Sequence, residues 1–242
     1  SNPTYLHFEY IKKLALKGFP LFIEKPAIHT LHNVDVLTKI IEEKKLVTYV
    51  ACNMRFHPCL SFLKEKLQIE QLNINEINVY CGSYLPDWRS DKNYKSIYSA
   101  NTDMGGGVHL DLFHEIDYTT WLFGFPKKSS SVLRSVSTIE INACDYANYI
   151  LEYEKFTASI VLNYYRRKVK RQIELVLDTE TLVVDLINNT IKSDSGNILF
   201  SDQNYELKHT YQSQLKYFID SLNNDILTMN SFSESIKNLK IC

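Results

Sequence analysis

Residues 19–53, "FPLFIEKPAIHTLHNVDVLTKIIEEKKLVTYVACN", place two apolar strands on either side of a helix, and this order indicates the fold class. The runs "LFIEKP" at 21–26 and "LVTYVACN" at 46–53 are continuously apolar before their polar ends, as in strands buried on both faces of a parallel sheet. The helix between them is predicted from an Asn33 N-cap and from apolar residues at helical spacing, namely Val34, Leu37, Ile40 and Ile41.

On either side of this stretch, "YLHFEYIKKLALKG" at 5–18 predicts a helix that ends at Gly18, and "HPCLSFLKEKL" at 57–67 predicts another. Helix, strand, helix and strand then alternate along the first sixty residues. This order is typical of a doubly wound parallel sheet, and we expect it to form the remnant of such a sheet at residues 1–58.

From residue 74 the pattern changes to strands rich in β-branched and aromatic residues, with Asn, Asp and Gly at their joints. These strands are predicted at 74–85, 130–142, 146–155, 157–167, 171–191 and 191–200, and helices at 107–124 and 211–224. The late helix should present Leu215, Phe218, Ile219 and Leu222 on one face. We therefore predict an α/β plus α+β protein, whose residues 59–242 form a domain with a large open, mainly antiparallel sheet and flanking helices.

The composition excludes several classes of protein. The 242 residues are 45% hydrophobic, and 27 Lys and Arg balance 28 Asp and Glu, so the charge does not favour a nucleic-acid partner. No apolar run approaches the roughly 20 residues that span a bilayer, and no secretion signal is present, so we expect a cytoplasmic protein without a membrane partner. The five cysteines form no CxxC pair and are predicted to be reduced packing residues.

Proton-transfer chemistry is indicated by "GGGVHLDLFHEID" at 105–117, which holds three of the seven glycines. Glycines before a helix permit a close backbone approach. On a continuous helix, Asp111, His114 and Asp117 would lie along one face, where a carboxylate orients an imidazole that can take a proton from a hydroxyl. The alternative without a function is that His114 is a buried helix histidine and Asp111 a carboxylate in the first turn of the helix. A metal site of His109, Asp111 and His114 is a further alternative, although His109 should point elsewhere.

Two charged segments follow the two predicted parallel strands, where open α/β sheets bind ligands. In "EKP", Lys25 can hold a negative charge and Glu24 can accept hydrogen bonds from ribose hydroxyls. In "NMRFHP" at 53–58, Arg55 and His57 end the second strand at the same rim. A surface ion pair before a proline turn is the alternative for "EKP".

Four segments in this order, "SNPTYLH…ALKGFPLFIEKP", "VACNMRFHP", "YLPDWR" and "GGGVHLDLFHEIDYTTWLFGFP", resemble the Gfo/Idh/MocA family of oxidoreductases, which includes glucose-fructose oxidoreductase and inositol dehydrogenase. The likeness extends over the whole chain. It implies an N-terminal Rossmann domain that binds NAD or NADP, and a C-terminal domain that contacts a sugar, cyclitol or nucleotide-sugar and forms a homodimer or homotetramer through its open sheet.

The resemblance also implies roles for individual residues. It makes Lys25 the catalytic lysine and His114 the acid/base, with Asp111 beside it, and it assigns no metal ligand. The resemblance also places six residues at the substrate, namely Lys25, Arg55, Trp88, Arg89, Asp111 and His114. The residues that it places at the cofactor are Asn2, Pro3, Thr4, His7, Glu24, Lys25, Pro26 and Arg55.

The sequence departs from the family pattern in two ways. Many members space the aspartate and histidine four apart, whereas "DLFH" spaces them three apart, so Asp117 is an alternative partner for His114. No GxGxxG pyrophosphate turn occurs, so we expect the chain to lack the first strands of the Rossmann domain and to be inactive alone. A non-catalytic binding or dimerisation module is the alternative function.

Overall fold

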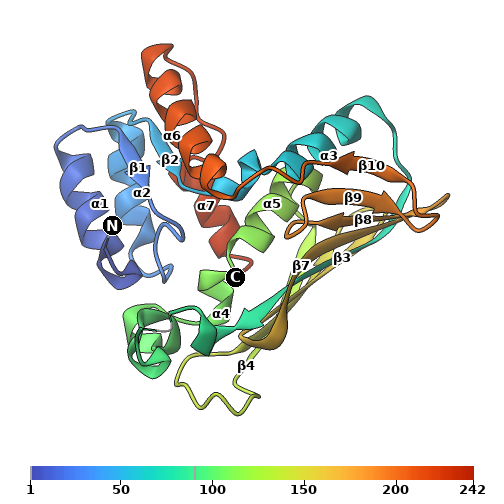
Figure 1. Ribbon diagram of the computed structural model, residues 1–242. Coiled ribbons are helices and arrows are strands. Elements are labelled where there is room, and N and C mark those ends of the chain that lie inside the picture. The colour runs from blue at the N-terminus through green and yellow to red at the C-terminus, as the bar shows by residue number, and fades with distance from the viewer. Residues whose placement is uncertain (1, 90) are drawn as a thin grey trace.

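The computed structural model describes residues 2–89 and 91–242. A small N-terminal layer and a large sheet lie on either side of the central helices α5 and α7, and together they form a V (Figure 1). No helix among the described residues is both long and apolar enough to cross a membrane.

The N-terminal layer has the predicted alternation of helices and strands. It contains α1 (His7–Leu16), β1 (Leu21–Ile23), α2 (Val34–Glu43) and β2 (Thr48–Val50). Strands β1 and β2 are parallel, with Leu21 opposite Thr48 and Ile23 opposite Val50. Ile11 of α1 and Leu37 of α2 are buried in one core with both strands, which is why the helical faces carry their apolar residues at these spacings.

The edge of β2 is covered by a segment from the far end of the chain. The Val50 N–H donates to the Asn230 carbonyl at 2.8 Å, and the Asn230 side-chain amide donates to the Val50 carbonyl at 2.8 Å. Helix α7 (Phe232–Leu239) follows and buries Phe232 and Ile236 in the core of the N-terminal layer. The packing thus crosses residue 58, and the predicted domain boundary there stays a prediction.

The large sheet has eight strands in the order β10-β9-β8-β7-β3-β6-β5-β4. Only β3 and β6 pair in parallel, and the other neighbours are antiparallel, which confirms the predicted open, mainly antiparallel sheet. The strands are β3 (Ile74–Tyr84), β4 (Lys128–Arg134), β5 (Tyr146–Glu152), β6 (Thr157–Asn163), β7 (Tyr165–Leu177), β8 (Thr181–Asp185), β9 (Thr190–Ser193) and β10 (Ile198–Ser201).

Helices α3 (Pro58–Ile69) and α5 (His114–Phe123) cover one face of this sheet (Figure 1). Inward side chains alternate with outward ones along each strand, so Val79 is buried under the helices while Tyr80 lies on the opposite face. In the described parts of the chain, the opposite face carries no helix.

The predicted helix at 107–124 is broken. It forms α4 (Val108–Asp111) and α5, because Leu112 leaves the helical conformation at φ −95° and ψ 34°. The prediction that Asp111, His114 and Asp117 share the face of one continuous helix is therefore wrong.

Helix α6 (Lys208–Asn223) also differs from its predicted packing. Phe218 is buried against the rings of Phe22 and Tyr49, whereas Leu215 and Ile219 are 52% and 46% exposed. The small β1–β2 sheet is wide enough to cover only one row of α6 side chains. Short 3₁₀ turns complete the chain at Thr4–Leu6, Asn53–Phe56, Leu85–Asp87, Tyr94–Ser96, Tyr98–Ala100 and Thr102–Met104.

Candidate active site

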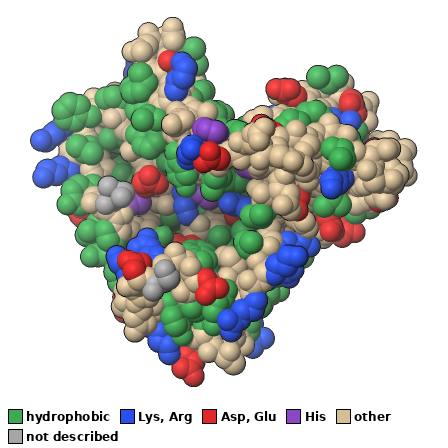
Figure 2. All heavy atoms as spheres, viewed as in Figure 1, with side chains coloured by type: hydrophobic (Ala, Val, Ile, Leu, Met, Phe, Trp, Pro, Cys, Tyr) green, Lys and Arg blue, Asp and Glu red, His purple; other side chains and the backbone are tan. Residues whose placement is uncertain are grey.

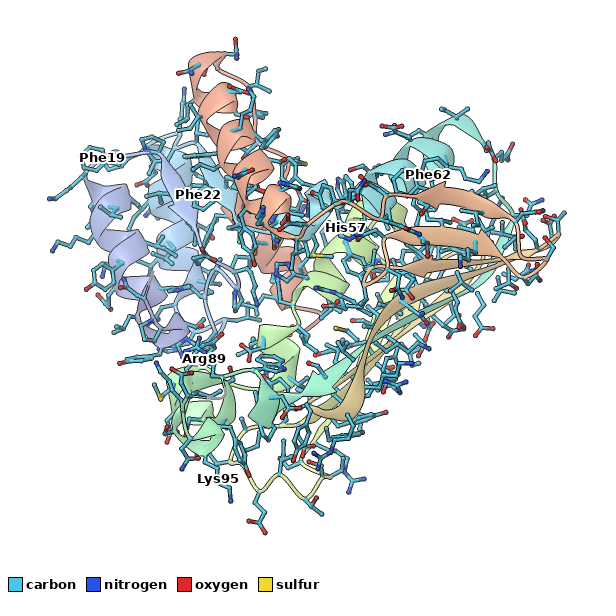
Figure 3. The ribbon with its side chains drawn as sticks, viewed as in Figure 1. Phe19, Phe22, His57, Phe62, Arg89 and Lys95 are labelled. Atoms are coloured by element: carbon cyan, nitrogen blue, oxygen red, sulfur yellow. The ribbon has the colours of Figure 1, made fainter. Side chains whose placement is uncertain are left out.

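A cleft of about 290 Å³ lies at the carboxyl end of β1, between the N-terminal layer and the loop segments near residues 89 and 98. Figure 2 shows a hollow at the centre of the molecule with basic and histidine side chains inside it, and Figure 3 shows Arg89 at the border of the N-terminal layer. The residues that line the cleft are Asn2, Pro3, Thr4, His7, Glu24, Lys25, Arg89 and Tyr98. Most of the predicted cofactor residues thus come together with Arg89.

Lys25 connects this cleft with the glycine-rich segment. Its Nζ donates a hydrogen bond to the main-chain carbonyl of Asp111, at the end of α4. The Asp111 side chain turns elsewhere, and its Oδ2 accepts a hydrogen bond of 2.6 Å from the Tyr164 hydroxyl. The predicted pair of Lys25 and Asp111 is therefore in contact, but through the backbone.

Aromatic side chains surround the Asp111 carboxylate. Trp88 packs edge-on against Tyr164, with ring centroids 5.4 Å apart, and its indole N–H donates to Ser83. Burial and the negative charge of Asp111 raise the pKa of Tyr98 to about 12, so this hydroxyl keeps its proton. Both tyrosines are therefore hydrogen-bond donors beside a carboxylate.

His114 begins α5 and is held neutral. Burial lowers its pKa well below 6.5, and the positive charges of Lys25 and Arg171 lower it further. Its Nδ1 is buried and has no hydrogen-bond partner among the described residues. Because neither Asp111 nor Asp117 bonds this ring, the predicted carboxylate–imidazole pair does not form in this structure.

The three glycines serve close contacts within the chain. A Cβ on Gly106 would lie 2.1 Å from the Tyr98 carbonyl oxygen, and a Cβ on Gly107 would lie 2.6 Å from the His109 ring. Gly107 also has a φ of +129°, which L side chains rarely adopt. The glycines thus press the start of α4 against the loop that carries Tyr98.

The His7 ring connects two segments that line the cleft. Its Nδ1 lies 3.0 Å from the Pro26 carbonyl, and its Nε2 lies 3.1 Å from the Asn2 carbonyl. The ring is buried, and it joins the segment at residues 2–7 to the "EKP" turn. Pro26 itself is buried behind this contact.

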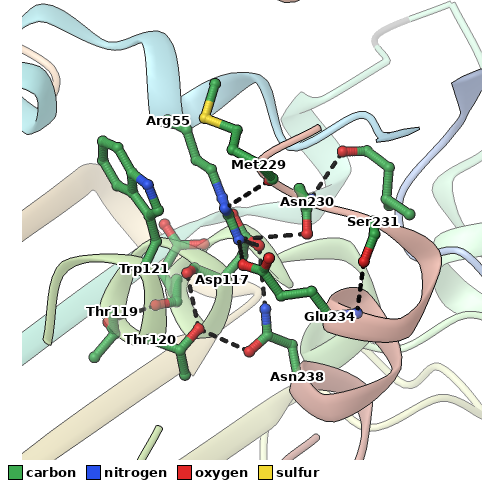
Figure 4. A network of polar contacts seen from close by, with 12 residues as sticks. Arg55, Asp117, Thr119, Thr120, Trp121, Met229, Asn230, Ser231, Glu234 and Asn238 are labelled. Carbon is green, nitrogen blue, oxygen red and sulfur yellow. Dashed lines mark hydrogen bonds and ion pairs between the residues drawn. The ribbon is translucent and has the colours of Figure 1, made fainter. Parts of the chain in front are cut away.

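Arg55 lies outside the cleft. It forms a two-point ion pair with Asp117 at 2.9 and 2.8 Å, donates to the Glu234 carboxylate in a second ion pair at 2.8 Å, and donates to the Met229 carbonyl (Figure 4). The side chain is 1% exposed. Asn238 donates to Asp117 at 3.1 Å, so this aspartate is also fully engaged. The structure thus places Arg55 and Asp117 in a buried network that joins α5 to α7.

The metal alternative finds no support in the part of the chain that the structure describes. There, no three His, Cys, Asp or Glu side chains are grouped so that they could hold a metal ion. The Nδ1 of His109 lies 2.9 Å from Cys144 Sγ, as expected for a ring that turns away from His114.

Sequence reasoning missed Tyr98, Tyr164, Glu115 and Arg171. Tyr164 separates β6 from β7, and a break between two strands is the one local signal that it carries. Glu115 and Arg171 form a buried ion pair at 2.6 Å across 56 residues, and no spacing rule predicts such a pair. A larger hollow of about 560 Å³ lies beside β8 and β9, but no histidine or cysteine lines it.

The cleft fits one end of a nicotinamide dinucleotide. The exposed Glu24 carboxylate can accept hydrogen bonds from ribose hydroxyls, and Lys25 is at the base of the same cleft. The glycine-rich turn that would hold a pyrophosphate is absent from the sequence. The residues present therefore fit the nicotinamide riboside end only.

Residues 64–183 match the family model of the GFO/IDH/MocA C-terminal domain. A curated relative, levoglucosan dehydrogenase of Pseudarthrobacter phenanthrenivorans, is 29% identical over 126 residues, or 51% of this chain. That match spans 32% of the relative's length.

Solved structures share the fold. A levoglucosan dehydrogenase in complex with NADH and levoglucosan has a TM-score of 0.87 at 16% identity, and the match covers 100% of this chain and 74% of that one. The WlbA dehydrogenase of Bordetella pertussis, in complex with NADH and UDP-GlcNAcA, has a TM-score of 0.81 at 17% identity over 99% of this chain and 72% of that one. UDP-N-acetylglucosamine 3-dehydrogenase of Acidithiobacillus ferrooxidans has a TM-score of 0.77 at 18% identity, and the match covers 99% of this chain and 73% of that one. Residues 64–183 of the chain thus carry the C-terminal domain of the GFO/IDH/MocA family.

Proposed function

We propose that the chain is the substrate-binding part of an oxidoreductase that interconverts a hydroxyl and a keto carbon of a sugar, cyclitol or nucleotide-sugar, with NAD or NADP as cofactor. The observation that carries the proposal is the convergence of Lys25, Asp111 and a neutral His114 at the end of β1. The substrates named for the structural relatives, levoglucosan and UDP-GlcNAcA, support a carbohydrate substrate.

In this proposal, His114 and Lys25 of this chain carry out the proton transfer. In the oxidation direction, the hydroxyl proton of the substrate passes to the neutral imidazole of His114, which is in the form that accepts a proton. The Lys25 ammonium stabilises the negative charge that develops on the substrate oxygen. In the reduction direction the same groups return the proton.

A bound nicotinamide would supply one chemistry at this site, the acceptance or donation of a hydride. Asn2, Pro3, Thr4, His7, Glu24 and Pro26 would hold its riboside end, with Lys25 between it and the substrate. The carbon that loses or gains the hydride must therefore lie within reach of both Lys25 and His114.

The substrate side of the cleft is aromatic. Trp88 is 38% exposed and packs edge-on against the buried Tyr164, and Arg89 lines the cleft. An indole face binds the apolar side of a sugar ring, and a guanidinium donates to hydroxyl or anionic groups. Arg55, with all its donors committed inside the protein, is not part of this proposal.

Cofactor binding requires more than the described chain supplies. In the two-stranded sheet, β1 pairs with β2 alone, and an apolar hollow of about 190 Å³ that includes Tyr10, Leu14 and Phe22 runs beside it. Parallel strands are normally covered on both faces and both edges. We infer that a further parallel strand pairs with β1 in the active enzyme. Residues 1–58 then belong to a nucleotide-binding domain together with that strand, and residues 59–242 form the substrate domain. The 242-residue chain alone is inactive in this proposal.

The test is a dehydrogenase assay on a form of the protein that carries the nucleotide-binding strands, with a panel of sugars and nucleotide-sugars and both nicotinamide cofactors. Lys25→Met should lower kcat by roughly 10² to 10³ with the fold intact, the usual range for loss of a group that stabilises developing charge. Lys17→Met, at an exposed lysine of the same layer, is the control and should leave kcat unchanged. Turnover by Lys25→Met at the wild-type rate would refute the assignment.

The open face of the large sheet supports a homodimer or homotetramer. It carries Val132 and Ile150, which are 51% and 36% exposed, and Tyr80 beneath the cations of Arg166 and Lys170. Exposed sheet faces of this mixed aromatic and apolar kind are commonly covered by a second subunit. Sedimentation equilibrium at micromolar concentration should give a dimer or tetramer, and a clean monomer would refute this assembly.

A further inference from the structure

Glu115 and Arg171 form a buried ion pair directly behind the proposed acid/base. Glu115 follows His114 in the first turn of α5 and is fully buried. Arg171 projects from β7 toward the helices, opposite Cys81 of β3, and its Nε donates to Glu115 Oε1 at 2.6 Å. The pair therefore joins the turn that carries His114 to the centre of the sheet.

Two buried ion pairs anchor the first turn of α5, that of Glu115 with Arg171 and that of Asp117 with Arg55. The helix break at Leu112 separates it from α4, and no side chain caps its N-terminus at Phe113. A helix start without a cap is held by its tertiary contacts. Of the two ion pairs, that of Asp117 with Arg55 joins the turn to α7, whereas that of Glu115 with Arg171 joins it to the sheet and includes one of the two cations that act on His114.

Several polar atoms around this pair have no partner. Glu115 Oε2, Tyr118 OH, Arg171 Nη2 and His114 Nδ1 are buried without a hydrogen bond to the described residues. The Tyr118 hydroxyl lies close enough to Glu115 and Arg171 for both charges to affect its pKa, which burial raises. Unpartnered polar atoms in a buried cluster are the mark of a functional or hydrated site rather than of simple packing.

Two charged groups from different elements act on His114, Lys25 from the turn after β1 and Arg171 from β7, and both lower its pKa. Each of them is also bonded to an acidic residue near His114 in sequence, Lys25 to the main-chain carbonyl of Asp111 and Arg171 to the carboxylate of Glu115. Cys81 of β3 adds a thiol whose pKa is raised by burial and by Glu115, so it is neutral. Arg171 and Lys25 are the two cations of the set.

We propose that Glu115 and Arg171 are positioning residues for His114: their buried ion pair ties the first turn of α5 to β7 and sets the place of the imidazole relative to Lys25. This inference rests on the proposed function of His114 as acid/base. Neither residue lines the cleft, so each acts through the histidine.

The test measures His114 itself, by NMR titration of its imidazole in the 242-residue chain without cofactor or substrate. Loss of one signal in His114→Gln assigns the resonance. In the wild-type chain the pKa of the ring should lie well below 6.5, because burial and the charges of Lys25 and Arg171 disfavour the imidazolium. In the double variant Glu115→Gln/Arg171→Met, which removes both charges and leaves neither buried alone, the pKa of His114 should rise by roughly one pH unit.

Two further variants complete the test. Lys170→Met removes a positive charge from the adjacent residue of the same strand, on the opposite face beside Tyr80, and should leave the pKa of His114 unchanged. Arg171→Lys keeps the charge but loses the Nε contact, so the pKa should stay low while the imidazole resonances move. If the double variant does not fold, the imidazole resonances of His114 in Arg171→Lys decide whether the ion pair positions this ring.

The proposal is overturned if the double variant leaves the pKa and resonances of His114 as in the wild type, if Lys170→Met shifts them equally, or if Arg171→Lys moves neither. Because the titration needs no turnover, its outcome is independent of the oxidoreductase assay. A wild-type rate for Lys25→Met would refute the proposed function and leave the positioning of His114 by this pair intact.

Discussion

Lys25 and Asp111 are joined by a hydrogen bond from the lysine amine to the aspartate's main-chain carbonyl, across 86 residues of sequence. The aspartate carboxylate is thereby left to accept from Tyr164. An ammonium group has three donors, so the bond orients Lys25 and leaves donors free for a substrate oxygen. The pairing of these two residues is thus an arrangement of the backbone, made possible by the close-packed glycine segment.

His114→Leu should abolish turnover in the active enzyme and leave the 242-residue chain as stable as before, or more stable. The buried Nδ1 of His114 has no partner, and an unpartnered buried polar group costs about 1 to 3 kcal/mol. The measurement is the urea midpoint of unfolding of the chain, together with kcat of the active enzyme. His32→Leu, at an exposed histidine, should change the free energy of unfolding by less than about 0.5 kcal/mol. A large loss of stability in His114→Leu would contradict this expectation.

Tyr164→Phe should destabilise the chain by about 1.5 to 3 kcal/mol, the range for a hydrogen bond to a charged group. The Asp111 carboxylate is 7% exposed and loses the donor at 2.6 Å. Urea unfolding at neutral pH measures the change. Tyr10→Phe removes a hydroxyl that is exposed and should be neutral, so equal effects of the two variants would argue against a role for the Tyr164–Asp111 bond.

Asp117→Ala should lower the free energy of unfolding by about 3 to 5 kcal/mol, because it leaves the Arg55 guanidinium buried with only Glu234 as a counter-charge. Glu140→Ala breaks a surface ion pair with Lys95, whose partners are 44% and 78% exposed, and should cost less than about 1 kcal/mol. Thermal and urea unfolding of both variants provide the comparison. An Asp117→Ala variant as stable as Glu140→Ala would show that the network in Figure 4 does not hold α5 to α7.

Stability should fall as the pH drops from 6.5 toward 4. Burial, with the charge of Arg171, lowers the pKa of His57 to about 4, so the folded chain keeps this ring neutral where the unfolded chain protonates it. Protons then bind preferentially to the unfolded state, and His57 alone accounts for a loss of about 2 kcal/mol between pH 7 and pH 5. His114 adds to the same trend, because its pKa is also lowered.

The variant His57→Asn tests this dependence. Asparagine keeps an acceptor for the Cys59 N–H at the start of α3, which His57 Nδ1 now supplies at 3.3 Å, but it does not titrate. Urea midpoints from pH 7 to pH 5 should fall less steeply than in the wild type. His32→Gln should retain the wild-type slope, and an unchanged slope in His57→Asn would contradict the assignment.

Local patterns were sufficient to predict most of the elements. The apolar runs at β1 and β2 and the helical spacing in α2 agree with the structure, because each depends on residues within one turn or one strand of each other. The large antiparallel sheet also follows from alternation along single strands, although the predicted strand at 171–191 divides into β7, β8 and β9 at two turns.

By itself, the sequence determined the alternation of helices and strands, the open antiparallel sheet, and the presence of Lys25, Asp111 and His114 in segments able to meet at one edge. The tertiary structure decided which of them touch. The break at Leu112 turns Asp111 toward Tyr164 and separates it from Asp117, which Arg55 binds instead. It also brings Glu115 to Arg171. Such pairings depend on the packing of distant segments and on the need to satisfy buried charges, and neither is encoded in local spacing.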